Sequence, residues 1–316
     1  MRALSAAFAE YRWAPSTEAI AAEVGLDPAE IRRFDGNVPP APSVAARPAA
    51  IAGALAQVNE YAHGGFPALV DAIARYAGVE PYNVVLGAGA DDLILLCARA
   101  FAGPDDVVAI DVEPTYPLFR IAAQLAGAEV GEASPAVTFT CRPNNPTGTL
   151  GPLSDARPLV VDEAYFEYAG ETAVGLIRDG VVVLRTFSKA FGLAGARVGY
   201  ALADEATASE LNRRQAPQPI SGISAALALA ALADPPDVTE QVAERERCAH
   251  ALVEIGLQPL PSSANFLFVP VESPEDVGAH LMRNGLVVRV FPDGIRFSIR
   301  DREDDDRLLA ELAALR

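Results

Sequence analysis

The sequence predicts an α/β fold: a doubly wound, mostly parallel sheet followed by a smaller α+β domain. Between residues 83 and 203, short runs rich in β-branched residues alternate with segments of helical periodicity. Most of these runs are continuously apolar, which is typical of strands buried on both faces of a parallel sheet. After residue 203 the pattern changes to long helices and then to short strands, which indicates a second unit.

The elements of the first unit follow in order along the chain. Strands are predicted at 83–87, 107–112, 136–141, 159–163, 181–186 and 197–203. Helices are predicted at 91–102 and 118–126, and the first opens with acidic residues that suit a helix N-terminus.

The second part of the chain has its own elements. Helices are predicted at 221–233, 238–255 and 274–284, strands at 264–270, 286–290 and 295–299, and a helix at the C-terminus. The first 45 residues end in a Pro-rich stretch that reads as an arm. We therefore divide the chain into an N-terminal arm (1–45), a large α/β domain (46–235) and a small α+β domain (236–316).

Composition excludes several classes of protein. The chain carries 42 acidic against 25 basic residues, a net charge of −17, so nucleic acid is not an expected partner. A hydrophobic content of 51% excludes general disorder. No apolar run reaches the roughly 18 residues of a membrane span, and the start of the chain does not look like a signal peptide. We expect a cytoplasmic protein with no membrane partner.

Metal and disulfide chemistry are not expected either. The 3 cysteines and 3 histidines are scattered along the chain. They form no spacing typical of zinc ligands or of a disulfide framework. The sequence predicts no metal site.

The basic residues include a single lysine, Lys189, against 24 arginines. An ε-amine can lose its proton and form an imine with an aldehyde, whereas a guanidinium stays charged. Lys189 lies between two predicted buried strands, where desolvation and nearby cations lower the pKa of an amine. Lys189 is therefore the candidate catalytic residue, although chance survival of one surface lysine is the plain alternative.

Other side chains near Lys189 suit a phosphate. Arg197 offers a planar fork that matches phosphate oxygens, and Thr186 and Ser188 offer hydroxyl groups. The segment that holds them all, RTFSKAFGLAGARVGY at 185–200, resembles the active-site signature of fold-type I aminotransferases. These enzymes use pyridoxal 5′-phosphate (PLP), and the similarity is greatest to the histidinol-phosphate aminotransferase branch. The resemblance implies that Lys189 forms a Schiff base with PLP.

Two further motifs strengthen the resemblance. CRPNNPTGT at 141–149 resembles the loop whose asparagine, here Asn145, hydrogen-bonds the phenolic oxygen of PLP. VVDEAYFEY at 160–168 resembles the strand end at which Asp162 pairs with the pyridine nitrogen and Tyr165 reaches the phenolate. A carboxylate beside that nitrogen keeps it protonated, so that the ring can absorb electrons from the substrate.

The remaining cofactor contacts implied by the resemblance lie earlier in the chain. GAGADD at 87–92 resembles the turn whose backbone amides, at Ala90 and Asp91, hold the phosphate at a helix N-terminus. Tyr116 matches the ring that stacks on the pyridine. Tyr61 matches a tyrosine that reaches the phosphate across a dimer interface, so the resemblance implies a homodimer. The motifs occur in the family's order, and the resemblance covers roughly residues 33 to 300.

Substrate contacts are also implied by the resemblance. Arg296 matches the arginine that binds the substrate α-carboxylate, and Arg289 matches one that helps to hold the phosphate of histidinol phosphate. Asn37 lies in a segment similar to the arm that lines the substrate pocket. Aromatic aminotransferases carry a similar arginine pair, and a surface ion pair is the plain alternative for Arg289.

The implied function is transfer of an amino group from L-histidinol phosphate to 2-oxoglutarate in ping-pong order, as in histidine biosynthesis. Aromatic amino acids are the second choice of donor. The same scaffold also runs decarboxylation and β-elimination, so a decarboxylase or lyase stays open. A PLP-binding regulator is a further alternative, because 16–34 superficially resembles a helix-turn-helix.

The chain departs from the family in its connections. Residues 151–158 are too few for the helix usually found there, and the link between the strands at 128–131 and 136–141 is short. Neither departure removes a named cofactor contact. They leave the identity of the substrate more open than the type of reaction.

Overall fold

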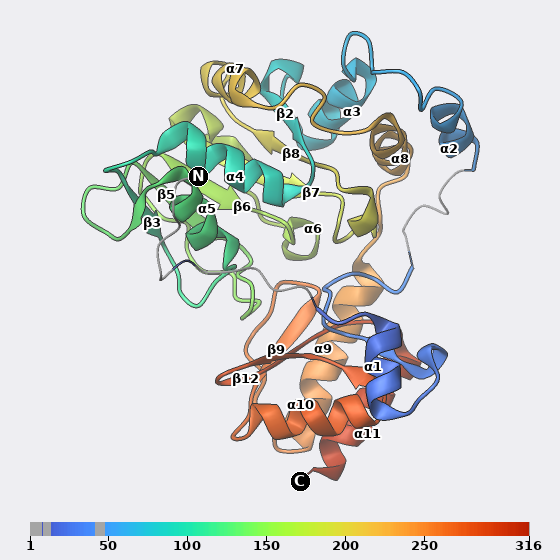
Figure 1. Cartoon of the computed structure of the whole chain (residues 1–316). Coiled ribbons are helices and arrows are strands. Elements are labelled where there is room, and N and C mark those ends of the chain that lie inside the picture. Colours follow the sequence, from blue (N-terminus) through green and yellow to red (C-terminus); the bar gives the residue numbers. More distant parts are fainter. Residues whose placement is uncertain (1–7, 9–13, 42–47, 316) are drawn as a thin grey trace.

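A mostly parallel sheet forms the larger of two lobes in the computed structural model, which describes residue 8 and residues 14–41 and 48–315 (Figure 1). Its strands are β2 (Val84–Gly87), β3 (Val107–Ile110), β4 (Glu129–Val130), β5 (Val137–Cys141), β6 (Leu159–Asp162), β7 (Val181–Thr186) and β8 (Gly199–Leu202). Their order across the sheet is β2-β8-β7-β6-β5-β3-β4. Among these described strands, β8 runs in the direction opposite to all the others. The predicted mostly parallel sheet is confirmed.

Helices cover both faces of this sheet. One face carries α4 (Ala90–Phe101), α5 (Leu118–Ala126) and α7 (Glu205–Arg214), and the other carries α3 (Pro67–Ala77) and α8 (Gly222–Leu232). Neighbouring strand residues divide between the two cores, since Val160 packs with the first set of helices and Val161 with the second. Burial on both faces explains why the strands are continuously apolar.

Short elements complete this lobe. They are α2 (Pro48–Leu55), α6 (Phe166–Ala169) and the 3-10 helices at Pro81–Asn83, Val174–Asp179 and Ala194–Ala196. The shortened connection at 151–158 contains no helix, as its length predicts. Helices α3 and α7 were not predicted from the sequence.

The smaller lobe combines an antiparallel sheet with helices. Its strands are β11 (Arg289–Phe291), β12 (Gly294–Ser298) and β9 (Phe266–Pro270), and its helices are α9 (Thr239–Glu254), α10 (Pro274–Arg283) and α11 (Arg302–Ala314). Figure 1 shows this lobe in orange and red, with the blue N-terminal segment beside it. The boundaries at residues 45 and 235 stay predictions.

The N-terminal segment packs on the smaller lobe. Strand β1 (Arg32–Arg33) pairs in parallel with β10 (Leu286–Val287), and α1 (Thr17–Val24) buries Ile20 against Val287. A 3-10 helix at Pro28–Glu30 and then β1 follow α1, so the second helix that a helix-turn-helix needs is missing from the described segment 16–34. That alternative is wrong. Residues 1–7, 9–13 and 42–45 of the predicted arm lie outside the described residues.

Among the described helices, none combines the length and the apolar composition needed to cross a membrane.

Candidate active site

The site lies where the carboxyl ends of β5, β6 and β7 meet. Asp162 is the last residue of β6, Asn145 follows β5, and Lys189 follows β7. The carboxyl edge of an open α/β sheet is where such folds bind ligands. Three residues that are far apart in the sequence are thereby gathered around one point.

Lys189 is held in a partly buried position. Its Nζ lies 3.4 Å from the backbone oxygen of Gly36 and 5.7 Å from the centre of the Tyr165 ring. Burial and the nearby Arg296 guanidinium lower the pKa of Lys189 to about 8. A sizeable fraction of neutral amine is therefore present near neutral pH, which a nucleophile or a proton acceptor requires.

Asp162 is a buried carboxylate with few partners. It is 4% exposed, and the hydrogen bond recorded for it among the described residues comes from the backbone N–H of Ala164 at 3.0 Å. Burial raises the pKa of Asp162 to about 7. A buried carboxyl group of this kind is suited to pair with a cationic ring nitrogen.

Tyr165 is fully enclosed by the site. Its hydroxyl oxygen accepts hydrogen bonds from Nδ2 of Asn37 at 3.1 Å and from Nδ2 of Asn145 at 3.4 Å. Burial raises the pKa of Tyr165, so the phenol is neutral at neutral pH. The structure thus brings Asn37, Asn145 and Tyr165 together beside Lys189.

Arg296, on β12, joins the small lobe to this cluster. Nη1 donates to Oδ1 of Asn145, and Nη2 donates to the backbone oxygen of Asp35 at 3.0 Å. Its guanidinium carbon lies 5.2 Å from the ring centre of Phe266 and 5.6 Å from that of Phe291. Nε is buried and, among the described residues, has no hydrogen-bond partner. A buried unpaired N–H indicates that the site takes an anionic group.

Arg289 lies next to Arg296. The two residues are Cα partners across β11 and β12, and the Arg289 side chain is exposed. Arg289 helps to lower the pKa of Arg296, after the larger effect of burial. Two neighbouring guanidinium groups favour a substrate with two anionic groups.

The start of α4 forms the other wall. The backbone N–H groups of Ala90 and Asp91 lie in its first turn, where helical N–H groups have no intrahelical partner. Arg197 reaches this point and bonds Oδ2 of Asp91 at 2.9 Å. Gly89 is required there: its φ is +87°, and a Cβ would lie 2.7 Å from Nη2 of Arg197. The turn is built to admit a guanidinium.

Hydroxyl groups line the same wall. Oγ1 of Thr186 donates to Oγ of Ser188 at 2.9 Å, and Nη1 of Arg197 lies 3.5 Å from Ser188 Oγ. The hydroxyl of Tyr116 donates to Oδ1 of Asp91 at 2.9 Å. First-turn amide groups, an arginine and hydroxyls at a helix N-terminus form a donor set that fits a phosphate.

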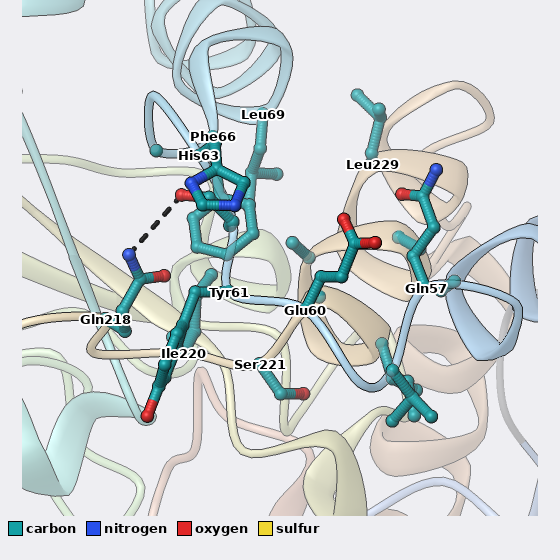
Figure 2. Close-up of a pocket in the computed structure, with 18 of the residues that line it drawn as sticks. Gln57, Glu60, Tyr61, His63, Phe66, Leu69, Gln218, Ile220, Ser221 and Leu229 are labelled. Carbon is teal, nitrogen blue, oxygen red and sulfur yellow. Dashed lines mark hydrogen bonds between the residues drawn. The ribbon is translucent and has the colours of Figure 1, made fainter.

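Tyr61 is not part of this cluster within one chain. It is 76% exposed and makes no hydrogen bond or ring contact with the residues around Lys189. Instead it lines a pocket of about 1220 Å³ between the segment before α3 and the start of α8 (Figure 2). On one side of the pocket, Nε2 of Gln218 donates to the backbone oxygen of Ala62 at 3.3 Å.

Sequence reasoning missed several residues of the site. The backbone oxygen of Asp35, in the arm, accepts a hydrogen bond from Arg296. The backbone of Asn37, also in the arm, is bonded by Asn265 and Ser298. No local motif marks them, because their partners are more than 200 residues away in the chain. One cluster of potential metal ligands, Glu244, Cys248 and Asp305, also lies together among the described residues, but Arg247 already neutralises Glu244.

The donor set fits PLP. Lys189 provides an amine for an aldehyde, Asp162 a carboxylate for a ring nitrogen, and the start of α4 a phosphate site. Nε of Arg296, which has no hydrogen-bond partner among the described residues, is suited to a substrate carboxylate.

Comparisons with known proteins show the family of the chain. A family model described as "Aminotransferase class I and II" matches residues 24–312. A histidinol-phosphate aminotransferase of Gloeobacter violaceus is 38% identical over 300 residues, covering 82% of this chain and 84% of the relative. An aromatic amino acid aminotransferase of Rhodococcus opacus is 35% identical over 300 residues, covering 83% and 84%. The crystal structure of a histidinol-phosphate aminotransferase from Sinorhizobium meliloti, in complex with PLP, superposes with a TM-score of 0.80 at 28% identity, covering 96% of this chain and 95% of that one.

Proposed function

Because the chain belongs to the aminotransferase class I and II family, we propose that it transfers the amino group of L-histidinol phosphate to 2-oxoglutarate. The chain is an enzyme with the fold of type I PLP-dependent transferases, and PLP is its cofactor. A cytoplasmic location and a role in histidine biosynthesis belong to the same proposal.

Each residue of the site has a distinct part in this proposal. PLP supplies an aldehyde for the amino group and a ring that withdraws electrons from the substrate Cα. Lys189, with its lowered pKa, would hold the cofactor through its aldehyde and would move the proton at the substrate Cα. Asp162 holds the ring nitrogen in its protonated form, and Tyr165 and Asn145 bind the ring oxygen. The start of α4, Arg197, Ser188 and Thr186 hold the phosphate, while Tyr116 covers the ring.

The pairing of Arg289 with Arg296 is the observation that carries the choice of substrate. Arg296 is buried and suits a carboxylate, which 2-oxoglutarate carries beside its keto group. Arg289 is exposed, and among the described residues no acidic side chain pairs with it. A free guanidinium beside the site suits the phosphate of histidinol phosphate or the distal carboxylate of 2-oxoglutarate.

The test is the absorption spectrum of the PLP-loaded protein. We expect L-histidinol phosphate to replace the visible band with that of the aminated cofactor, and 2-oxoglutarate to restore it. Arg289→Ala should raise the half-saturating concentration of histidinol phosphate about tenfold or more, as expected for loss of a charged hydrogen bond. A spectrum that ignores histidinol phosphate would contradict the proposal.

Aromatic amino acids are the second candidate donors, because the Rhodococcus opacus relative has a similar identity. L-tyrosine and L-phenylalanine in the same assay separate the two choices. With an aromatic donor, Arg289→Ala should leave the half-saturating concentration unchanged, since the one anion of that donor is the α-carboxylate assigned to Arg296. Release of CO₂ or ammonia instead of a keto acid would indicate a decarboxylase or lyase.

We also propose that the enzyme is a homodimer. Around the Tyr61 pocket the large apolar side chains of Leu55, Val58 and Leu229 are exposed together with Tyr61. Clustered apolar exposure of this kind is typical of an interface. A second copy would let Tyr61 serve the partner's phosphate site. Sedimentation velocity tests this: a dimer is expected, and a monomer at micromolar concentration would contradict it.

A further inference from the structure

Asn37 is held more tightly than a pocket-lining residue needs to be. It is 2% exposed and has a left-handed backbone, with φ of +51°. Its backbone N–H donates to Oγ of Ser298 at 2.8 Å, and its backbone oxygen accepts from Nδ2 of Asn265 at 3.1 Å. Such a conformation persists only where the surroundings determine it, and it is common at functional sites.

The side chain of Asn37 points to Tyr165 and not to open space. Nδ2 donates to the Tyr165 hydroxyl at 3.1 Å, and Oδ1 lies 3.3 Å from Oγ of Ser298. The amide nitrogen is therefore already engaged by Tyr165. The role of Asn37 as a substrate contact stays a prediction.

Asn145 makes the same kind of bond, and its orientation is fixed independently. A guanidinium has only N–H donors, so the atom of Asn145 that faces Arg296 must be the oxygen. Nδ2 of Asn145 then faces the Tyr165 hydroxyl, at 3.4 Å.

Two donors bond the phenol oxygen of Tyr165, and this determines where the phenol proton points. A tyrosine hydroxyl has two acceptor lone pairs and one proton. With Asn37 and Asn145 donating to the oxygen, the proton of Tyr165 is directed to a third partner. The charged and titratable groups around the ring are Arg296 on β12, Cys141 on β5, Asp162 on β6, and Lys189.

We propose that Asn37 is a positioning residue that makes Tyr165 a hydrogen-bond donor to the ring oxygen of the cofactor. This inference rests on the proposed placement of Tyr165 against PLP. Because the Asp35 backbone oxygen accepts from Arg296, the same short segment of the arm links the Tyr165 donor to the substrate-carboxylate arginine.

The test is the pH midpoint of the visible absorption of the bound cofactor, measured without substrate. A donor to the ring oxygen stabilises negative charge there, so its loss raises the midpoint. Tyr165→Phe removes the donor and should raise the midpoint by about one pH unit. Asn37→Asp replaces the donating amide by an acceptor, turns the Tyr165 proton away from the cofactor and should raise the midpoint by a similar amount.

Asn212→Asp, the same substitution at an exposed position on α7, is the matched control. It makes the same change from amide to carboxylate outside the site, so the midpoint should stay at the wild-type value. Thermal unfolding of each cofactor-free variant shows that it folds.

Asn37→Gly keeps the left-handed backbone accessible and serves where Asn37→Asp does not fold. It should raise the midpoint by about half a pH unit in the wild-type background. It should not change the midpoint in the Tyr165→Phe background, because the effect acts through the Tyr165 hydroxyl. An equal shift in both backgrounds, or a wild-type midpoint in both Asn37 variants, would overturn the inference. A wild-type midpoint in Tyr165→Phe would overturn the placement of Tyr165 itself. Since no substrate is added, failure of the proposed reaction leaves this test intact.

Discussion

Two consecutive carboxylates at the end of β6 have opposite surroundings. Glu163 is 1% exposed and is matched by the Arg185 guanidinium at 3.0 Å, by the hydroxyl of Thr172 and by the N–H of Ala173. Asp162 is 4% exposed and has the N–H of Ala164. Side chains of neighbouring strand residues point to opposite faces of the sheet, which separates the two environments.

The guanidinium groups repeat this contrast. Nε and Nη2 of Arg185 bond Glu163, and its guanidinium carbon lies 3.4 Å from the centre of the Phe166 ring. Arg296 is also buried, but its Nε has no hydrogen-bond partner in the part of the chain that the structure describes. A buried charge whose partners are all present supports the fold, whereas one with a bond still to make indicates a ligand.

The largest expected effect comes from removing the Asp162 carboxylate. Asp162→Asn should lower kcat/KM by about 10²- to 10⁴-fold, the usual range for losing an acid–base or electrostatic group, because an amide cannot keep the ring nitrogen protonated. The unfolding free energy should stay level or rise at neutral pH. Steady-state kinetics and urea unfolding measure the two. In the matched Glu163→Gln, kcat/KM per folded molecule should fall less than tenfold, and the reverse pattern would contradict the comparison.

Removing the cation that pairs with Glu163 should lower the free energy of unfolding. Arg185→Leu leaves a buried carboxylate without its cation and should lower the unfolding free energy by about 3–5 kcal/mol. Arg178→Leu, at an exposed position, should change it by no more than about 0.5 kcal/mol. Equal unfolding midpoints in urea for the two variants would show that the buried pair is not structural.

The pKa of Asp162 gives a pH signature. Its folded-state pKa of about 7 lies above the ordinary value of 3.8, so between these limits the folded cofactor-free protein holds a proton that the unfolded chain has lost. Stability should therefore fall as pH rises through this window, by up to about 4 kcal/mol. Asp162→Asn should lack this contribution.

Urea unfolding of both cofactor-free proteins across the window checks this signature. Glu167 and Asp305 also have raised pKa values, but they affect both proteins alike, so the difference isolates Asp162. Parallel stability profiles would contradict the assignment.

The smallest expected effect is on KM, when Arg296 is replaced by lysine. Arg296→Lys keeps the charge but loses the planar fork, so the KM for 2-oxoglutarate should rise about tenfold. Arg283→Lys, at the exposed end of α10, should leave KM unchanged. An unchanged KM in Arg296→Lys would argue against a bidentate carboxylate site.

Local patterns predicted most of the fold and one wall of the site. The apolar strands from β2 to β8 and the residues Asp162 and Lys189 are marked by their neighbours in the chain. Helix α7 was missed because its sequence is mostly polar and buries only Ala208 and Leu211. The bonds from Asn37 to Tyr165 and Ser298 were missed because they span 128 and 261 residues. Such contacts depend on the packing of the two lobes, which no local spacing encodes.

The most direct test of the account is to locate the cofactor. Borohydride reduction of the PLP-loaded protein fixes the bond between the aldehyde and the amine, and peptide mass mapping then finds the modified residue. The account predicts a single label on Lys189, the only lysine of the chain, and none in Lys189→Arg. A label on the N-terminal amine, or no label in the wild-type protein, would contradict it.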